Sequence, residues 1–191
     1  MADYVTDGKI GIDLTATYAS TSAGSTSLFP VTPGSRVNTS NNGVYMFVRA
    51  ESTINAFDAV IMSTYSDSAS TTPVMRAVPV TTTNAAALGF NMVGFAQTAI
   101  ASSYYGWVGL NGMLKVNLLI GCNPKVPLYT TATAGSLDDT TVSAGFIQGI
   151  VANTSATSAS APFCMVNNAG LIMVGAGYTR LMPRPQSGVS F

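Results

Sequence analysis

The sequence predicts an all-β protein, a compact β-barrel or β-sandwich of about nine short strands with an extended arm at each end. Short runs of β-branched, aromatic and aliphatic residues recur about every ten positions, between clusters of Gly, Pro, Asn and Ser. Glu, Lys, Gln and Arg, which normally cover the wet face of a helix, supply only 12 of the 191 residues. We therefore expect a core domain at residues 44–176, an N-terminal arm at residues 1–43 and a C-terminal tail at residues 177–191.

The arm is rich in Ser, Thr, Gly, Pro and Asn, and its apolar residues are too sparse to form a core. One interpretation is a disordered segment. The other is an extended arm that docks on a neighbouring subunit through regularly placed apolar anchors. The expected anchors are Tyr4, Ile10, Ile12, Leu14, Tyr18, Leu28 and Phe29.

About nine runs are expected to form the strands of the core. The clearest is 113–120, where aliphatic residues from Leu114 to Ile120 alternate with polar ones, as in a strand with one buried face. Pro79 cannot donate to a ladder, so its strand should lie at a sheet edge or end near the proline. The expected strands are residues 44–49, 59–63, 74–80, 92–99, 106–110, 113–120, 126–130, 146–151 and 163–166, with 171–174 as a possible tenth.

The stretch "SSYYGWVGLNG", residues 102–112, contains two tyrosines, the only tryptophan, three glycines and no charge. We expect strand 106–110 to turn tightly at Asn111-Gly112 into strand 113–120, because Asn-Gly is a strong hairpin signal. Trp107 then packs inside the barrel or between subunits. The alternative is a glycan-stacking platform made by Trp107 with Tyr104 and Tyr105.

Two further segments lie outside the expected strands. Residues 83–89 favour one or two helical turns, with Asn84 as a cap. The tail is kept extended by two prolines, and its residues Arg180 and Arg184 make it positive and a candidate interface.

The composition argues against catalysis, cofactors and metals. Histidine is absent and Glu51 is the only glutamate, so the usual general acids and bases are nearly missing. Cys122 and Cys164 are too few for a structural zinc site, and we expect them to be reduced core residues. Asp138-Asp139 in "SLDDT" favours a turn in which an Asp caps backbone groups. We expect no enzyme, no cofactor and no metal.

Charge also limits the partners. Only 8% of the residues are charged, against about 25% in a typical domain, and they balance to a net charge of +0. No field therefore recruits nucleic acid or a membrane, and no apolar run approaches the ~20 residues that cross a bilayer. The N-terminus shows no apolar segment of a signal peptide. Neutral surfaces tend to associate, so we expect much of the exterior to pack against partner chains.

The order of five stretches, "AFDAVIMS", "MVGFAQTAI", "YYGWVGLNGMLKV", "VPLYTTATAGSLDDT" and "FIQGIV", resembles the head-decoration, or capsid-cement, proteins of tailed bacteriophages. In that family a Val-Gly-x-Ala strand, an aromatic-Gly-x-Val strand and an "IxGI" strand follow one another. The resemblance covers about Ile54 to Asn167. Phe95 departs from it, since smaller residues are frequent there.

The resemblance implies a β-barrel that sits on the outside of the assembled capsid and stabilises the shell without catalysis. Its implied partners are the major capsid protein and further copies of itself, commonly as a homotrimer. The implied localisation is the virion surface, after synthesis in the host cytoplasm. Two alternatives stay open: another virion component, such as a head fibre, tail or minor shell protein, and a glycan-binding β-module.

Overall fold

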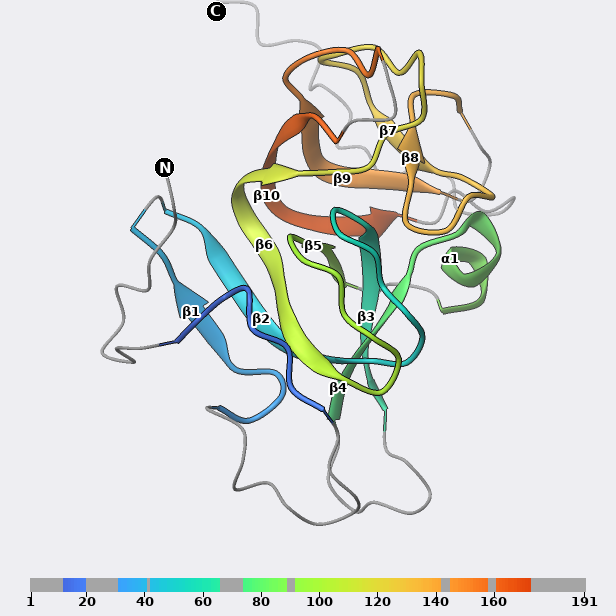
Figure 1. Ribbon diagram of the computed structural model, residues 1–191. Helices are drawn as coiled ribbons and strands as arrows, with labels where there is room; N and C mark the ends of the chain where they lie inside the picture. The colour runs from blue at the N-terminus through green and yellow to red at the C-terminus, as the bar shows by residue number, and fades with distance from the viewer. Residues whose placement is uncertain are drawn as a thin grey trace, which may run out of the picture.

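Five strands close into a barrel in the computed structural model (Figure 1). The structure describes residues 12–19, 31–40, 42–65, 74–88, 92–141, 145–157 and 161–172. β2 runs parallel to β4, and the remaining neighbours around the ring, β4–β3, β3–β5, β5–β6 and β6–β2, are antiparallel. The predicted all-β fold class is thus confirmed. The barrel strands are β2 (Val44–Ala50), β3 (Ala59–Tyr65), β4 (Val74–Pro79), β5 (Met92–Ala96) and β6 (Tyr105–Lys115).

The barrel interior is filled by aliphatic and methionine side chains. Two glycines make room for the larger ones: a Cβ at Gly94 would lie 2.9 Å from Cε of Met62, and one at Gly106 would lie 2.7 Å from Cδ1 of Ile100. Glycine in these strands therefore serves close packing rather than a turn. The interior cluster consists of Met46, Val48, Ala50, Ile54, Val60, Met62, Ala77, Ala96, Ile100, Val108 and Leu110.

A second sheet grows from the end of β6. Residues from Asn111 to Lys115 leave the barrel and pair with β10 (Phe163–Ile172), which pairs with β9 (Phe146–Ala152). β7 (Leu128–Thr130) and β8 (Leu137–Asp138) complete this sheet. Figure 1 shows β6 bending as it passes from the barrel to the second sheet. One face of that sheet packs against the outside of the barrel and forms the larger core cluster.

The predicted hairpin at Asn111-Gly112 is wrong, because β6 continues through it. Gly112 has a φ of 112° but is paired with Val166 of β10. The register of β2 against β6 shifts between Val44 and Tyr45, which places a bulge at the same point. Asn-Gly is a turn signal because glycine tolerates positive φ, and here that freedom bends a strand instead.

Other boundaries also differ from the predictions. The expected strand 163–166 and residues 171–172 of the expected strand 171–174 are parts of β10, whose register against β9 shifts between Val166 and Gly170. Pro79 ends β4, as expected, but β4 lies between β2 and β3 rather than at an edge. After β6 ends at Lys115, Val116 and Leu118 are buried as expected, but Ile120 lies in a turn and is 69% exposed.

Two strands and one helix complete the comparison. β1 (Arg36–Asn38), within the expected arm, pairs with β2 and is not predicted by the sequence. β8 is not predicted either, because two residues give no periodicity. The helix α1 (Thr82–Leu88) is confirmed, but its cap is Thr81 and not the predicted Asn84, which lies inside the helix and exchanges hydrogen bonds with Thr81. Within the described part of the chain, no helix is long and apolar enough to span a membrane.

Candidate functional site

Residues 12–19, one of the described parts of the expected arm, lie against the chain's own barrel. Tyr18 donates from its N–H to the carbonyl of Tyr105 at 2.9 Å, and the N–H of Tyr105 donates back at 2.8 Å. Asp13 closes a turn by accepting from the N–H and hydroxyl of Thr15. The arm therefore adds a short strand-like contact to the start of β6.

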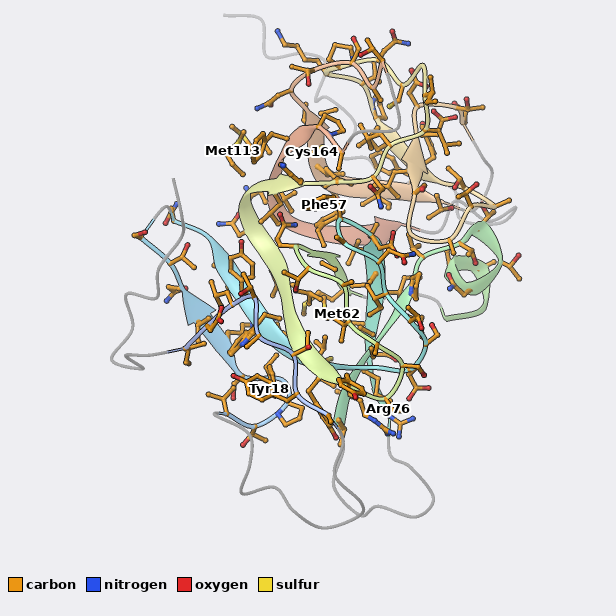
Figure 2. The ribbon with its side chains drawn as sticks, viewed as in Figure 1. Tyr18, Phe57, Met62, Arg76, Met113 and Cys164 are labelled. Atoms are coloured by element: carbon orange, nitrogen blue, oxygen red, sulfur yellow. The ribbon has the colours of Figure 1, made fainter. Side chains whose placement is uncertain are left out.

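Aromatic rings line this contact, which we call the arm seam: Tyr18, Phe47, Tyr105 and Trp107. The ring of Phe47 lies 5.8 Å from that of Tyr18, 5.9 Å from that of Tyr105 and 5.0 Å from that of Trp107, between centroids. Ile12 and Leu14 also pack on the core, partly buried. The arm seam lies at the start of β6, and Figure 2 shows Tyr18 there, far from Met113 near the end of the same strand.

Trp107 is only 1% exposed, and its Nε1–H has no hydrogen-bond partner. It does not pack inside the barrel, as one expectation had it, but lies on the outer side of β6, since the inner positions are those of Gly106 and Val108. Its ring is therefore covered within the protomer and cannot stack on a sugar. Of the two tyrosines in the glycan alternative, Tyr104 is exposed and Tyr105 belongs to the arm seam.

The remaining candidate interface residues, Tyr4, Ile10, Leu28, Phe29, Arg180 and Arg184, lie outside the described residues.

A surface that the sequence analysis does not identify lies on the second sheet. Four large apolar side chains point away from the core there: Met113 of β6, Val151 of β9, and Phe163 and Met165 of β10, which are 47, 42, 50 and 59% exposed. Met165 is the register partner of both Met113 and Val151, so these three form one row across neighbouring strands. Phe163 lies two residues along β10 on the same side. We call this surface the apolar face.

The opposite side of the same strands is buried. Leu114, Ile150, Cys164 and Val166 alternate with the exposed residues and belong to the core. An antiparallel sheet with one solvated side normally alternates apolar and polar residues. This sheet is apolar on both sides, as a sheet covered by a further layer would be.

Lys115 stands at the rim of the apolar face. Its Nζ lies 5.5 Å from the ring centroid of Phe163 and 5.2 Å from that of Phe57, so the cation sits between two aromatic rings. The side chain of Gln97 holds the backbone of Lys115 by accepting from its N–H and donating to its carbonyl, both at 3.1 Å. The charge thus has partners within the protomer.

Phe57 is presented by a rigid loop. Its φ of 71° is unusual for a bulky residue, and hydrogen bonds on both sides maintain it. Its N–H donates to Ala96 and its carbonyl accepts from the N–H of Asn117. The buried carboxylate of Asp58 accepts from the N–H of Asn55 at 2.7 Å and from Nδ2 of Asn117 at 2.9 Å. The loop therefore fixes the ring beside Lys115.

The only glutamate of the chain is engaged in an ion pair. Glu51 follows β2 and its carboxylate accepts from the guanidinium of Arg76 on β4. Arg49 lies next to Arg76 in the parallel register of these strands. The carboxylate therefore compensates one of two adjacent cations, which is a structural role.

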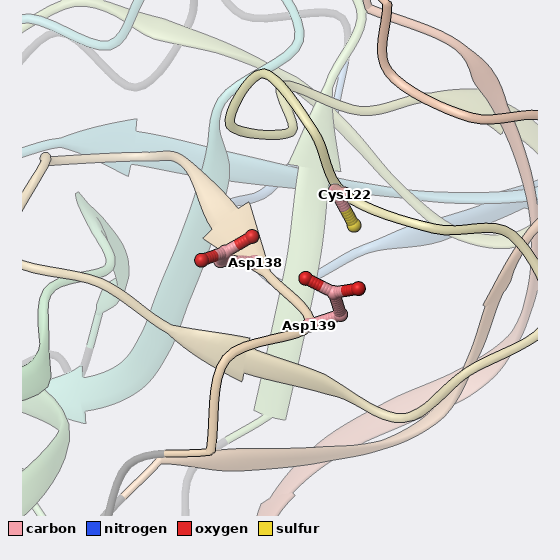
Figure 3. Close-up of side chains that lie close together, drawn as sticks. All are labelled: Cys122, Asp138 and Asp139. Atoms are coloured by element: carbon pink, nitrogen blue, oxygen red, sulfur yellow. The ribbon is translucent and has the colours of Figure 1, made fainter.

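Cys122, Asp138 and Asp139 bring possible metal ligands together, with one ligand atom of each within 4.8 Å of the others (Figure 3). Burial, together with the charges of the two nearby carboxylates, raises the pKa of the Cys122 thiol to about 11. Hydrogen bonds from the side chain and backbone of Asn123 lower the pKa of Asp139. The predicted local turn capped by an Asp is therefore wrong: Asp138 belongs to strand β8, and Asp139 accepts from Asn123, which lies 16 residues earlier in the chain. Three donors are one fewer than structural zinc uses, so we assign no metal here.

Both cysteines are free and buried, as the sequence predicts. Burial raises the pKa of Cys164 to about 12. A thiol of this kind stays neutral and behaves as a small apolar side chain.

Searches against protein-family models, curated proteins and solved structures found no match for this chain.

Proposed function

We propose that this chain is a virion structural protein that binds the outside of a tailed-phage capsid and stabilises the shell through protein contacts, without catalysis. The proposal begins from the resemblance in sequence. The five resembling stretches fall in chain order on the loop and strand β3, β5, β6, β7 with β8, and β9, while β4 and α1 between β3 and β5 carry none of them. They therefore coincide with structural elements of the barrel and second sheet.

The observation that carries the proposal is the apolar face on a chain with 8% charged residues and a net charge of +0. An exposed cluster of large apolar side chains marks a surface for a protein partner. A neutral exterior also allows many copies to assemble closely without charge repulsion. Both properties fit a component that is present in many copies on a shell.

A capsid add-back experiment tests this function. Capsids are prepared from the phage that encodes the chain after deletion of its gene, and the purified protein is added at increasing concentration. We expect saturable co-sedimentation at many copies per capsid, and release of packaged DNA at a higher temperature than in capsids without the protein. Heat-unfolded protein is the control. Failure to bind, with unchanged DNA release, would contradict the proposal.

Electron microscopy of the decorated capsids separates this function from that of a head fibre or tail protein. Density at repeated positions over the whole shell supports the decoration role. Density at a single vertex or along the tail supports the other virion role.

A further inference from the structure

We propose that the apolar face is a two-fold contact in which two copies of this chain pack face to face. This inference goes beyond the capsid role and does not depend on it. It starts from the composition of the face: two methionines, a phenylalanine and a valine in one continuous patch. Methionine and aromatic residues are enriched in the centre of protein interfaces, and the methionine side chain adapts to an irregular partner.

The charge of the face selects the chemistry of its partner. Lys115 at the rim is already placed between the rings of Phe57 and Phe163, so the face does not require an acidic partner. Register neighbours on the same side are amides, since Asn111 pairs with Asn167 at the far end of the row. An amide both donates and accepts, so such a rim is compatible with itself. The fitting partner is therefore apolar in its centre and nearly uncharged.

Within the part of the chain that the structure describes, a second copy meets that description through the same face. Among the described residues, six large hydrophobic side chains are exposed, and four of them make up the apolar face. The other two, Tyr104 before β6 and Ile120 after it, are single residues at separate positions. A head-to-tail contact would need a second apolar patch, which the described part of the chain lacks. Identical surfaces that meet each other generate a two-fold axis.

The apolar face is also preorganised for contact. Phe163 and Met165 stand on the central strand β10, which is paired on both sides by β6 and β9. The ring of Phe163 is further restrained by Lys115. The strand backbone and the ring of Phe163 are therefore already ordered before a partner covers the face, which lowers the entropy cost of the contact.

The test compares Met165→Lys with Ile120→Lys, the same change at an exposed residue outside the face. Masses are measured by analytical ultracentrifugation over a range of protein concentrations, and circular dichroism confirms that both variants fold. We expect an even number of copies for the unaltered protein, a dimer or two associated trimers. Met165→Lys should weaken this pairing by about tenfold or more, and Ile120→Lys should leave it unchanged.

Covalent capture gives a second readout that does not rely on disruption. Met165→Cys should form a disulfide-linked dimer on oxidation, because Met165 lies in the middle of the face, whereas Ile120→Cys should not. Cys122 and Cys164 are buried and do not interfere. A monomer at all concentrations, or pairing unaffected by Met165→Lys, would overturn the inference. If the unaltered protein is a monomer and Met165→Lys no longer binds capsids, the face contacts the shell protein instead, and the capsid function stands.

Discussion

Gly112 shows how a single residue decides the path of the chain. Gly112 has a φ of 112°, and a Cβ added there would lie only 3.1 Å from Cα of Gly43. Because glycine has no Cβ, β6 can bend out of the barrel at this point while remaining a strand. The same Asn-Gly pair is a hairpin signal in sequence, because both uses need positive φ. The two outcomes differ only in what the following residues pair with.

Gly112→Ala should destabilise the protein more than Gly121→Ala. Both glycines have positive φ, of 112° and 97°, so both substitutions carry the backbone strain of a Cβ, about 1–2 kcal/mol. Only at Gly112 does the Cβ also meet backbone, whereas nothing lies within 4 Å at Gly121. We expect an additional loss of about 1–2 kcal/mol for Gly112→Ala in urea unfolding. Equal losses in the two variants would contradict a specific role for Gly112.

At the scale of elements, the sequence identifies the apolar anchors of segment 12–19 but not the surface that they cover. The sequence identifies Ile12, Leu14 and Tyr18 as apolar anchors of an extended segment, and the structure places them on the chain's own core. Which surface they cover depends on the aromatic side chains of β2 and β6, which are distant in sequence. The expectation that the arm docks on a neighbouring subunit stays a prediction.

Tyr18→Ala should lower stability and change the environment of Trp107. The substitution removes the ring that packs on the edge of Phe47, which in turn contacts Trp107. Loss of an aromatic contact and its partly buried area should cost about 1–2 kcal/mol. Trp107 is the only tryptophan, so its fluorescence emission reports on the seam directly and should shift to longer wavelength.

Tyr104→Ala is the matched control for the arm seam. Tyr104 is 38% exposed and belongs to none of the ring contacts of the seam. We expect its removal to leave both the emission of Trp107 and the denaturant midpoint nearly unchanged. Identical behaviour of the two variants would show that the arm does not stabilise the barrel.

Some strands were predicted from the sequence more accurately than others. β2, β3 and β9 are apolar runs with clear boundaries, and their predicted limits agree with the structure within two residues. The second half of β10 is separated from the first by Asn167 and Gly170, which look like a break in sequence. The structure uses these residues for a shift of register instead. Local propensity cannot distinguish a bulge from a loop, because both need the same residue types.

At the scale of the whole molecule, the shortage of charge determines how copies should associate. Eight basic and eight acidic residues cancel, and the apolar face carries Lys115 only at its rim. The proposed pairing of two copies would therefore draw on apolar burial rather than on ion pairs.

Self-association should consequently not weaken when salt is added. We expect the dissociation constant in sedimentation velocity runs to stay constant or decrease as NaCl rises from about 0.05 M to about 0.5 M. Salt screens ion pairs over this range, whereas apolar contacts are not screened. Dissociation at the higher salt concentration would show that ion pairs hold the copies together.

The sequence by itself determined the all-β class, the positions of most strands, the burial of Trp107 and of both cysteines, and the scarcity of groups for acid–base chemistry. These properties follow from composition and local periodicity, which each segment carries alone. The tertiary structure decided the closure of the barrel, the bend of β6 and the place of residues 12–19. It also decided which side of β10 is exposed. In "FCMV" both sides of the strand are apolar, so alternation gives no direction, and only the barrel that packs against Cys164 and Val166 leaves Phe163 and Met165 facing outward.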